Sequence, residues 1–72
     1  MEPMVLNQIC AALEAGQRGV LVLELGEGRS RFVGQDHALV GEMKNAIDEV
    51  LTSGLSAVRT IGTHAYLLKP IG

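Results

Sequence analysis

Aromatic side chains are nearly absent from this 72-residue chain, which contains Phe32, Tyr66 and no tryptophan. Proteins that hold single-stranded nucleic acids stack bases on aromatic rings and neutralise phosphates with clustered lysine and arginine. Here the six basic residues are scattered from Arg18 to Lys69, and the formal net charge is −2. The sequence therefore predicts no nucleic-acid partner.

Cysteine and long hydrophobic runs are also scarce. The single cysteine, Cys10, excludes an internal disulfide and a zinc site built from cysteine pairs, and it fits a reducing compartment. Aliphatic runs such as Val20–Leu23 are far too short to cross a bilayer, and Met1–Met4 lacks the positive charge that opens a signal peptide. We therefore expect a cytoplasmic protein that does not associate with a membrane.

Hydrophobic residues make up 47% of the chain, which is enough for one folded domain over residues 1–72. A domain of this size builds only a thin core, so self-association as a homodimer, or a partner protein, would add stability. Apolar residues recur at helical spacing over Pro3–Ala15 and His37–Ser53, and a glycine that suits a helix end follows each segment. Asp36 is the predicted N-cap of the second helix. Cys10 lies on the apolar stripe of the first helix, where we expect a buried thiol.

Four strands are predicted from the remaining apolar segments. They cover Gly19–Leu25, Arg29–Val33, Ala57–Ile61 and His64–Lys69, and Pro70 closes the last one. Gly26-Glu27-Gly28 joins two strands rather than a strand and a helix, so we interpret it as a hairpin turn and not as a phosphate-binding loop. The aliphatic run Val20–Leu23 indicates a central strand that is either covered on both faces, or covered on one face and dimerised on the other.

The predicted fold class is α+β, with the order helix–strand–strand–helix–strand–strand in a single domain. The economical architecture is a four-stranded, mostly antiparallel sheet with two helices on one face. The order of the strands within the sheet stays open, because several arrangements satisfy the rules for connections.

No grouping of residues indicates catalysis or metal binding. His37 and His64 are the only histidines, and their spacing matches no metal site. The serines have neither a nucleophile elbow nor a triad context, and no acid–base pair has a suitable spacing. We therefore predict a protein that is not an enzyme, has no catalytic residues and binds no metal.

The loop Gly34–His37 is the strongest candidate for ligand binding. It leads from a strand into the predicted second helix, where backbone N–H groups favour an anion. Arg29 and Arg31 on the preceding strand would add charge-assisted donors. Asp36 would repel an anion at the helix start, so ordinary capping is the simpler interpretation of the loop. If a ligand binds, the candidate binding residues are Arg29, Arg31, Gly34, Gln35 and His37.

Three segments, Val5–Leu23, Val33–Gly54 and Gly62–Pro70, share a pattern of apolar runs broken by glycines. In order, they resemble the first helix and strand, the glycine loop with its helix, and a short later strand of one family. This family is the xanthine dehydrogenase accessory proteins (XdhC/CoxI type), at their N-terminal region. Its members bind molybdenum cofactor and assist its delivery to molybdenum hydroxylases. The cysteine and glutamate of the family's glycine loop are not present in residues 35–40, and Gly34 alone remains of the glycine cluster.

Two functions remain open from the sequence. The resemblance implies a non-catalytic binding or assembly module for molybdenum hydroxylase maturation, with molybdenum cofactor as the ligand and a hydroxylase as the partner. The alternative is a structural or interaction module that associates with itself or with a larger protein and binds no cofactor. The thin aliphatic core and the run Val20–Leu23 motivate this alternative, because uncovered strands pair readily across a two-fold axis.

Overall fold

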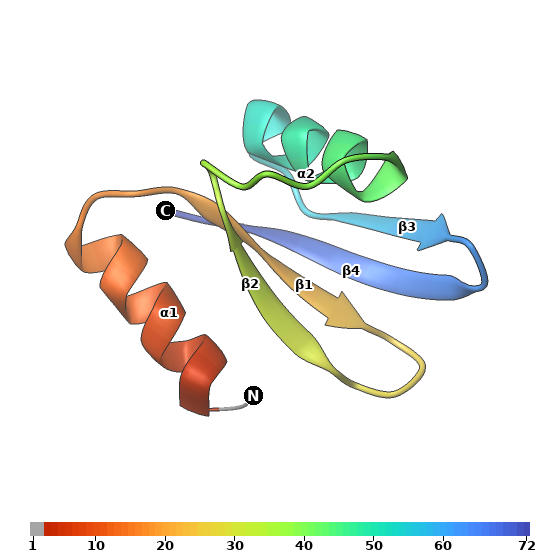
Figure 1. Cartoon of the computed structure of the whole chain (residues 1–72), viewed down its shortest axis with the longest axis horizontal. Coiled ribbons are helices and arrows are strands. Elements are labelled where there is room, and N and C mark those ends of the chain that lie inside the picture. Colours follow the sequence, from red (N-terminus) through yellow and green to blue (C-terminus); the bar gives the residue numbers. More distant parts are fainter. Residues whose placement is uncertain (1–2) are drawn as a thin grey trace.

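A computed structural model describes residues 3–72 of the chain (Figure 1). Its elements follow one another as α1 (Pro3–Glu14), β1 (Gly19–Glu24), β2 (Ser30–Gly34), α2 (Glu42–Ser53), β3 (Ala57–Ile61) and β4 (His64–Ile71). The predicted α+β class and the order of the two helices and four strands are confirmed.

The strands form one antiparallel sheet in the order β2-β1-β4-β3. Each half of the sheet is a hairpin, β1–β2 and β3–β4, as the glycine-containing turns predict. The two hairpins join where β1 pairs with β4, and there Val22 lies opposite Leu68. This central pairing was open in the sequence because its partners lie far apart along the chain.

Alternate residues of a strand point to opposite faces of the sheet, and directly paired residues share a face. We call the face under α2 the covered face. Its core consists of buried aliphatic side chains from the sheet (Val20, Val22, Val33 and Leu68) and from α2 (Ala46, Ile47 and Val50). We call the other the open face, and it carries Leu21, Leu23, Phe32, Val58, Leu67 and Lys69.

The first helix, α1, lies beside β2 rather than over the core (Figure 1). Its buried side chains, Val5, Ile9 and Ala12, are separate from the cluster under α2. Ala12 lines a groove together with Phe32, which belongs to the open face. The expectation of two helices on one face is thus refined: α2 alone fills that role, and α1 covers the β2 margin. The aliphatic run of β1 makes both faces apolar, so its pattern does not specify which face a helix takes.

Cys10 is exposed, and the prediction of a buried thiol is wrong. The apolar stripe of α1 is wide enough to be turned in more than one way. The structure turns Val5 and Ile9 inward and leaves Leu6 and Leu13 each 51% exposed, on the same side as Cys10.

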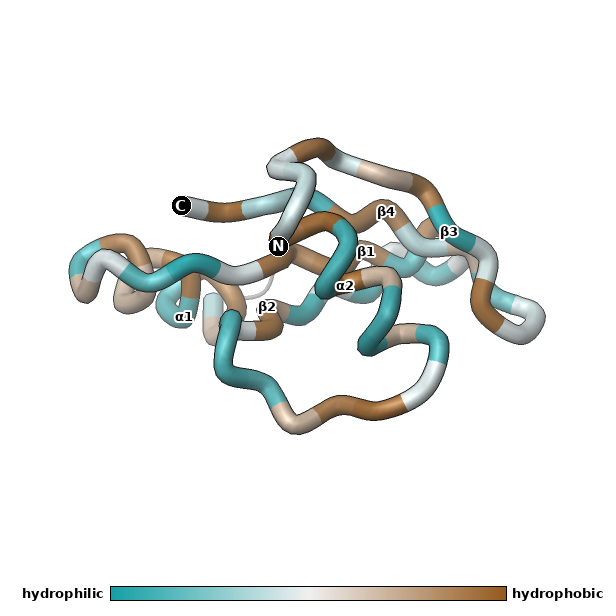
Figure 2. The backbone as a smooth tube through the Cα atoms, turned by 90° about the horizontal axis from the view of Figure 1, so that it is seen from above, coloured by the Kyte–Doolittle hydropathy of each residue, from teal (hydrophilic) through white to brown (hydrophobic). Residues whose placement is uncertain are grey.

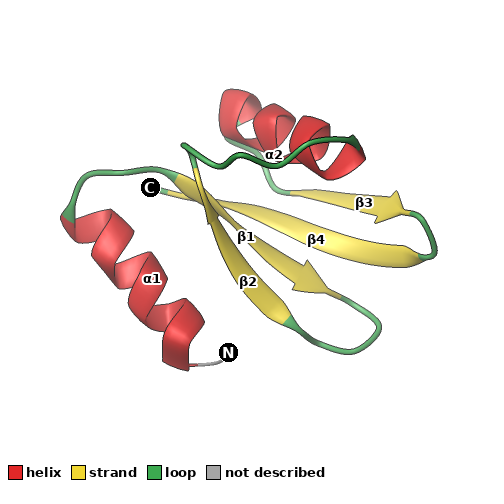
Figure 3. Ribbon diagram, viewed as in Figure 1, coloured by secondary structure: helices red, strands yellow, loops and turns green. Residues whose placement is uncertain are grey.

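The second helix, α2, begins at Glu42 and not at His37. Residues 35–41 form an irregular connection instead (Figure 3). Gly41 is the N-cap, with a φ of 85° that favours glycine, so Asp36 does not cap the helix as predicted. The predicted helix end is confirmed, because Gly54 adopts the left-handed conformation.

Pro70 does not close the last strand, since β4 continues to Ile71. On one side Pro70 lies opposite Val20 of β1. On the other side β3 begins at Ala57, which is paired with Leu68, so no strand is adjacent to Pro70 there. Proline is tolerated because no ladder hydrogen bond is needed from its nitrogen on that side.

Candidate functional site

The five predicted binding residues do not converge on one site. Gly34 pairs with Gly19 at the end of the β1–β2 ladder. Gln35 extends that ladder: its N–H donates to the carbonyl of Arg18 (3.0 Å), and its side-chain Oε1 accepts from the N–H of Arg18 (3.3 Å). Both residues therefore have structural partners in the backbone.

His37 is used to attach the irregular connection to α2. Its side chain is only 8% exposed, and its Nε2 lies 3.0 Å from Oδ1 of Asp48. Its Nδ1 accepts from the N–H of Leu39 (3.2 Å), so a neutral ring carries its proton on Nε2 and donates it to Asp48. Lys44 donates to the other oxygen of Asp48 (2.6 Å). These bonds, that from Lys44 foremost and that from His37 next, hold the pKa of Asp48 below its usual value of 3.8.

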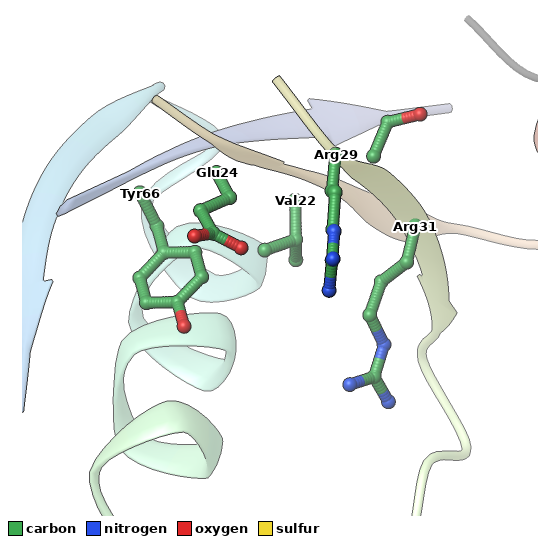
Figure 4. Close-up of a pocket in the computed structure, with 6 residues that line it drawn as sticks. Val22, Glu24, Arg29, Arg31 and Tyr66 are labelled. Carbon is green, nitrogen blue, oxygen red and sulfur yellow. The ribbon is translucent and has the colours of Figure 1, made fainter. Parts of the chain in front are cut away.

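Arg29 and Arg31 do come together. They line a cavity of about 300 Å³ on the covered face, beside the part of the sheet that α2 packs against. Val22, Glu24, Ser30 and Tyr66 complete its walls. The side chains of the two arginines, Val22, Glu24 and Tyr66 extend to the same side of the sheet (Figure 4). We call this cavity the arginine cleft. Of the five residues on that side, four sit on three strands, and their shared side follows from the β2–β1–β4 register, which pairs Arg31 with Val22 and Glu24 with Tyr66. Arg29 lies just before β2, which begins at Ser30 and not at Arg29 as predicted.

Of the three charged residues that line the arginine cleft, Arg29 and Glu24 have ion-pair partners among residues 3–72 and Arg31 has none. Arg29 contacts Glu27 (Nε to Oε2, 2.9 Å), and Glu24 contacts His64 (Oε1 to Nδ1, 3.0 Å). Arg31 makes no side-chain hydrogen bond or ion pair with any residue in 3–72, and the hydroxyl of Tyr66 makes no hydrogen bond there either. The sequence indicated the two arginines, but Glu24 and Tyr66 were missed. Glu24 faces Arg29 across the β1–β2 hairpin, where its N–H donates to the Arg29 carbonyl (2.7 Å), so the register of that hairpin could have indicated it. Tyr66 is brought alongside only by the pairing of β4 with β1.

The open face is the second feature of note. Its central row, Leu23–Leu67–Val58, runs across three strands. Lys69 is the only charged side chain that the register places on this face of the sheet. The two central strands, β1 and β4, are rich in hydrophobic residues, which are the brown segments of these strands in Figure 2. Val58 is 57% exposed, so the row runs out into solvent at the β3 edge.

Among residues 3–72, no group of three histidine, cysteine, aspartate or glutamate side chains is placed to hold a metal ion. Neither of the two helices there has the length and apolar character that a bilayer span requires.

Comparison of the chain with protein-family models, with curated proteins and with solved structures gives no match. The resemblance to xanthine dehydrogenase accessory proteins therefore stays a prediction from the sequence pattern.

Proposed function

We propose that this chain is a non-catalytic interaction module that assembles with a second copy of itself through the open face. The observation that carries the proposal is the apolar row Leu23–Leu67–Val58. This row lies on the face of the sheet opposite the core, which α2 does not cover. Stable antiparallel sheets pack such a face against another layer. Of the two alternatives for the run Val20–Leu23, the proposal takes the second, in which α2 covers one face of the strand and a second copy covers the other.

The area of the surface supports a dimer that includes α1. A sheet of four strands about 4.8 Å apart, each of about six residues rising about 3.4 Å, presents roughly 400 Å² on one face. A standard interface buries about 800 Å² per partner. The outer side of α1, where Met4 is 71% exposed and Leu6 and Leu13 are each 51% exposed, supplies further apolar surface at the β2 margin. The sheet face alone is about half of the standard area, so the proposed two-fold contact also includes the outer side of α1.

A matched pair of valine variants tests this proposal. Val58→Glu places a charge in the open face, and Val40→Glu places the same charge in the irregular connection, where Val40 is 84% exposed. Both residues are on the surface, so neither change should unfold the domain. In sedimentation velocity over a dilution series, we expect the wild type and Val40→Glu to dimerise alike. Val58→Glu should weaken the dimer at least about tenfold, because it leaves a charge buried without a partner. A wild type that stays monomeric, or two variants that behave alike, would contradict the proposal.

A narrower form of the proposal is an assembly factor for molybdenum hydroxylases that binds molybdenum cofactor. It is supported by the sequence resemblance and by the cavity that Arg29 and Arg31 share. Gly34, Gln35 and His37 lie outside that cavity, so the ligand surface would be smaller than the sequence implied. Calorimetric titration with molybdopterin is the test. No heat of binding would end this form of the proposal and leave the dimer untouched.

A further inference from the structure

Arg31 occupies an unusual place in the sheet. It lies directly opposite Val22, which is 4% exposed, in a row that continues through Leu68 to Ala57 on the covered face. A strand whose inner positions are aliphatic would be expected to carry another aliphatic residue here. Instead Arg31 presents a guanidinium beside the core, at the margin of the sheet that α2 leaves uncovered.

The other arginines of the described chain each have an acceptor within the protein. Arg18 donates to the carbonyl of Leu51 (2.6 Å), Arg29 contacts Glu27, and Arg59 contacts Glu49 (2.8 Å). Arg31 has no such acceptor among residues 3–72, and its cleft also contains the unengaged hydroxyl of Tyr66. A fork of N–H donors and one O–H donor thus face the same cavity without a partner.

We infer that the arginine cleft binds the carboxylate of a small amphipathic acid. The guanidinium of Arg31 is suited to donate two parallel hydrogen bonds to a carboxylate, and Tyr66 lies at the opposite side of the same cavity (Figure 4). Val22, the ring of Tyr66 and the aliphatic stem of Arg29 give the apolar body of the ligand a surface to pack on. A cavity of about 300 Å³ matches the lower end of small-molecule sites.

The charge of the cleft selects a monoanion. Arg29 and Glu27 offset each other, while the carboxylate of Glu24 lines the cleft and is 15% exposed. Arg31 attracts and Glu24 repels any anion in the cleft, and both energies double from a monoanion to a dianion. The cost of desolvating the ligand rises with the square of its charge, so a phosphate dianion loses more on entering the cleft than a carboxylate does. The site lies on the covered face, so a dimer formed through the open face leaves it accessible.

The experiment is an NMR titration of the ¹⁵N-labelled full chain with benzoate as the probe. Two further arms are benzamide, which removes the charge, and phenyl phosphate, which doubles it. We expect saturable shifts with benzoate at the amides of residues 22–24, 29–31 and 66, with a Kd on the order of a millimolar for so small a ligand. Benzamide and phenyl phosphate should bind at least about tenfold more weakly. Benzoate binding no tighter than benzamide, or shifts that never saturate, would overturn the inference.

Two arginine variants make the test specific. Arg31→Gln should weaken benzoate binding at least about tenfold, because the charge and the fork of donors are both lost. Arg59→Gln is the matched control, since Arg59 lies on the same face but outside the cleft, and benzoate affinity should be unchanged. Equal loss in both variants would show non-specific attraction and reject the site. An acetylated peptide with a free C-terminal carboxylate, compared with its amide, tells whether a peptide end or a small acid is the better source of the group. Dimerisation is measured separately by sedimentation, so failure of either proposal leaves the other standing.

Discussion

The two faces of this sheet have similar aliphatic residues but different neighbours. On the covered face, Val20 and Leu68 are fully buried under Ile47 and Val50 of α2. On the open face, Leu23 and Leu67 form an equally apolar row, yet within residues 3–72 no helix packs over its centre. Strand composition alone therefore does not distinguish a finished core from an interface. The difference comes from which face receives the one helix that crosses the sheet.

The largest difference in stability should appear when two adjacent leucines of β4 are each replaced by alanine. Leu68→Ala removes a fully buried side chain from the covered face and should cost about 2–5 kcal/mol of unfolding free energy, from lost burial and the cavity left behind. Leu67→Ala removes the same atoms from the open face and should cost the monomer about 1 kcal/mol or less. Urea unfolding at low protein concentration measures both. Equal costs would mean that the open face is already packed within the monomer.

A smaller effect on stability is expected at Gly19, where the ring of Phe32 on the open face packs closely against the backbone. A Cβ atom added at Gly19 would lie 2.3 Å from Cζ of Phe32 and 2.8 Å from the carbonyl oxygen of Val33. Gly19→Ala must therefore displace the Phe32 ring and the strand, which should cost about 1–3 kcal/mol. Gly26→Ala is the control, because nothing lies within 4 Å of its added Cβ, and its unfolding free energy should change by about 0.5 kcal/mol or less. Similar thermal unfolding midpoints for the two variants would contradict this contact.

The smallest effect on stability concerns α2, where Asp48 binds His37 and Lys44. The pKa of Asp48 is lower in the folded chain than its usual value of 3.8, so the ionised carboxylate stabilises the fold above that pH. This contribution is lost as pH falls through the lowered pKa. Asp48→Asn should thus be less stable than wild type at neutral pH, and the two should converge in strong acid. Asp36→Asn, an exposed control without an ion pair among the described residues, should show no such convergence in a pH series of thermal unfolding.

Much of the fold was predictable because its signals are local. The hairpin turn at Gly26-Glu27-Gly28 and the helix end at Gly54 both follow from backbone preferences of nearby residues. The start of α2 was not predictable in this way. Asp36 and His37 have the polarity of a helix start, but His37 bonds instead to Asp48 within α2. The helix begins at Glu42, with Gly41 as its N-cap. A contact formed only after folding overrode the local pattern.

The amino-acid sequence by itself determined the order of the elements, the aliphatic character of the strands and the spacing of Arg29 and Arg31, two residues apart where β2 begins. Only the tertiary structure decided that β4 lies against β1, and this one pairing has two consequences. It places Tyr66 beside Glu24 in the arginine cleft, and it brings Leu67 next to Leu23 on the open face. The physical reason is that side-chain alternation along a strand is a local property. The neighbour of a strand is instead chosen by burial summed over the whole chain.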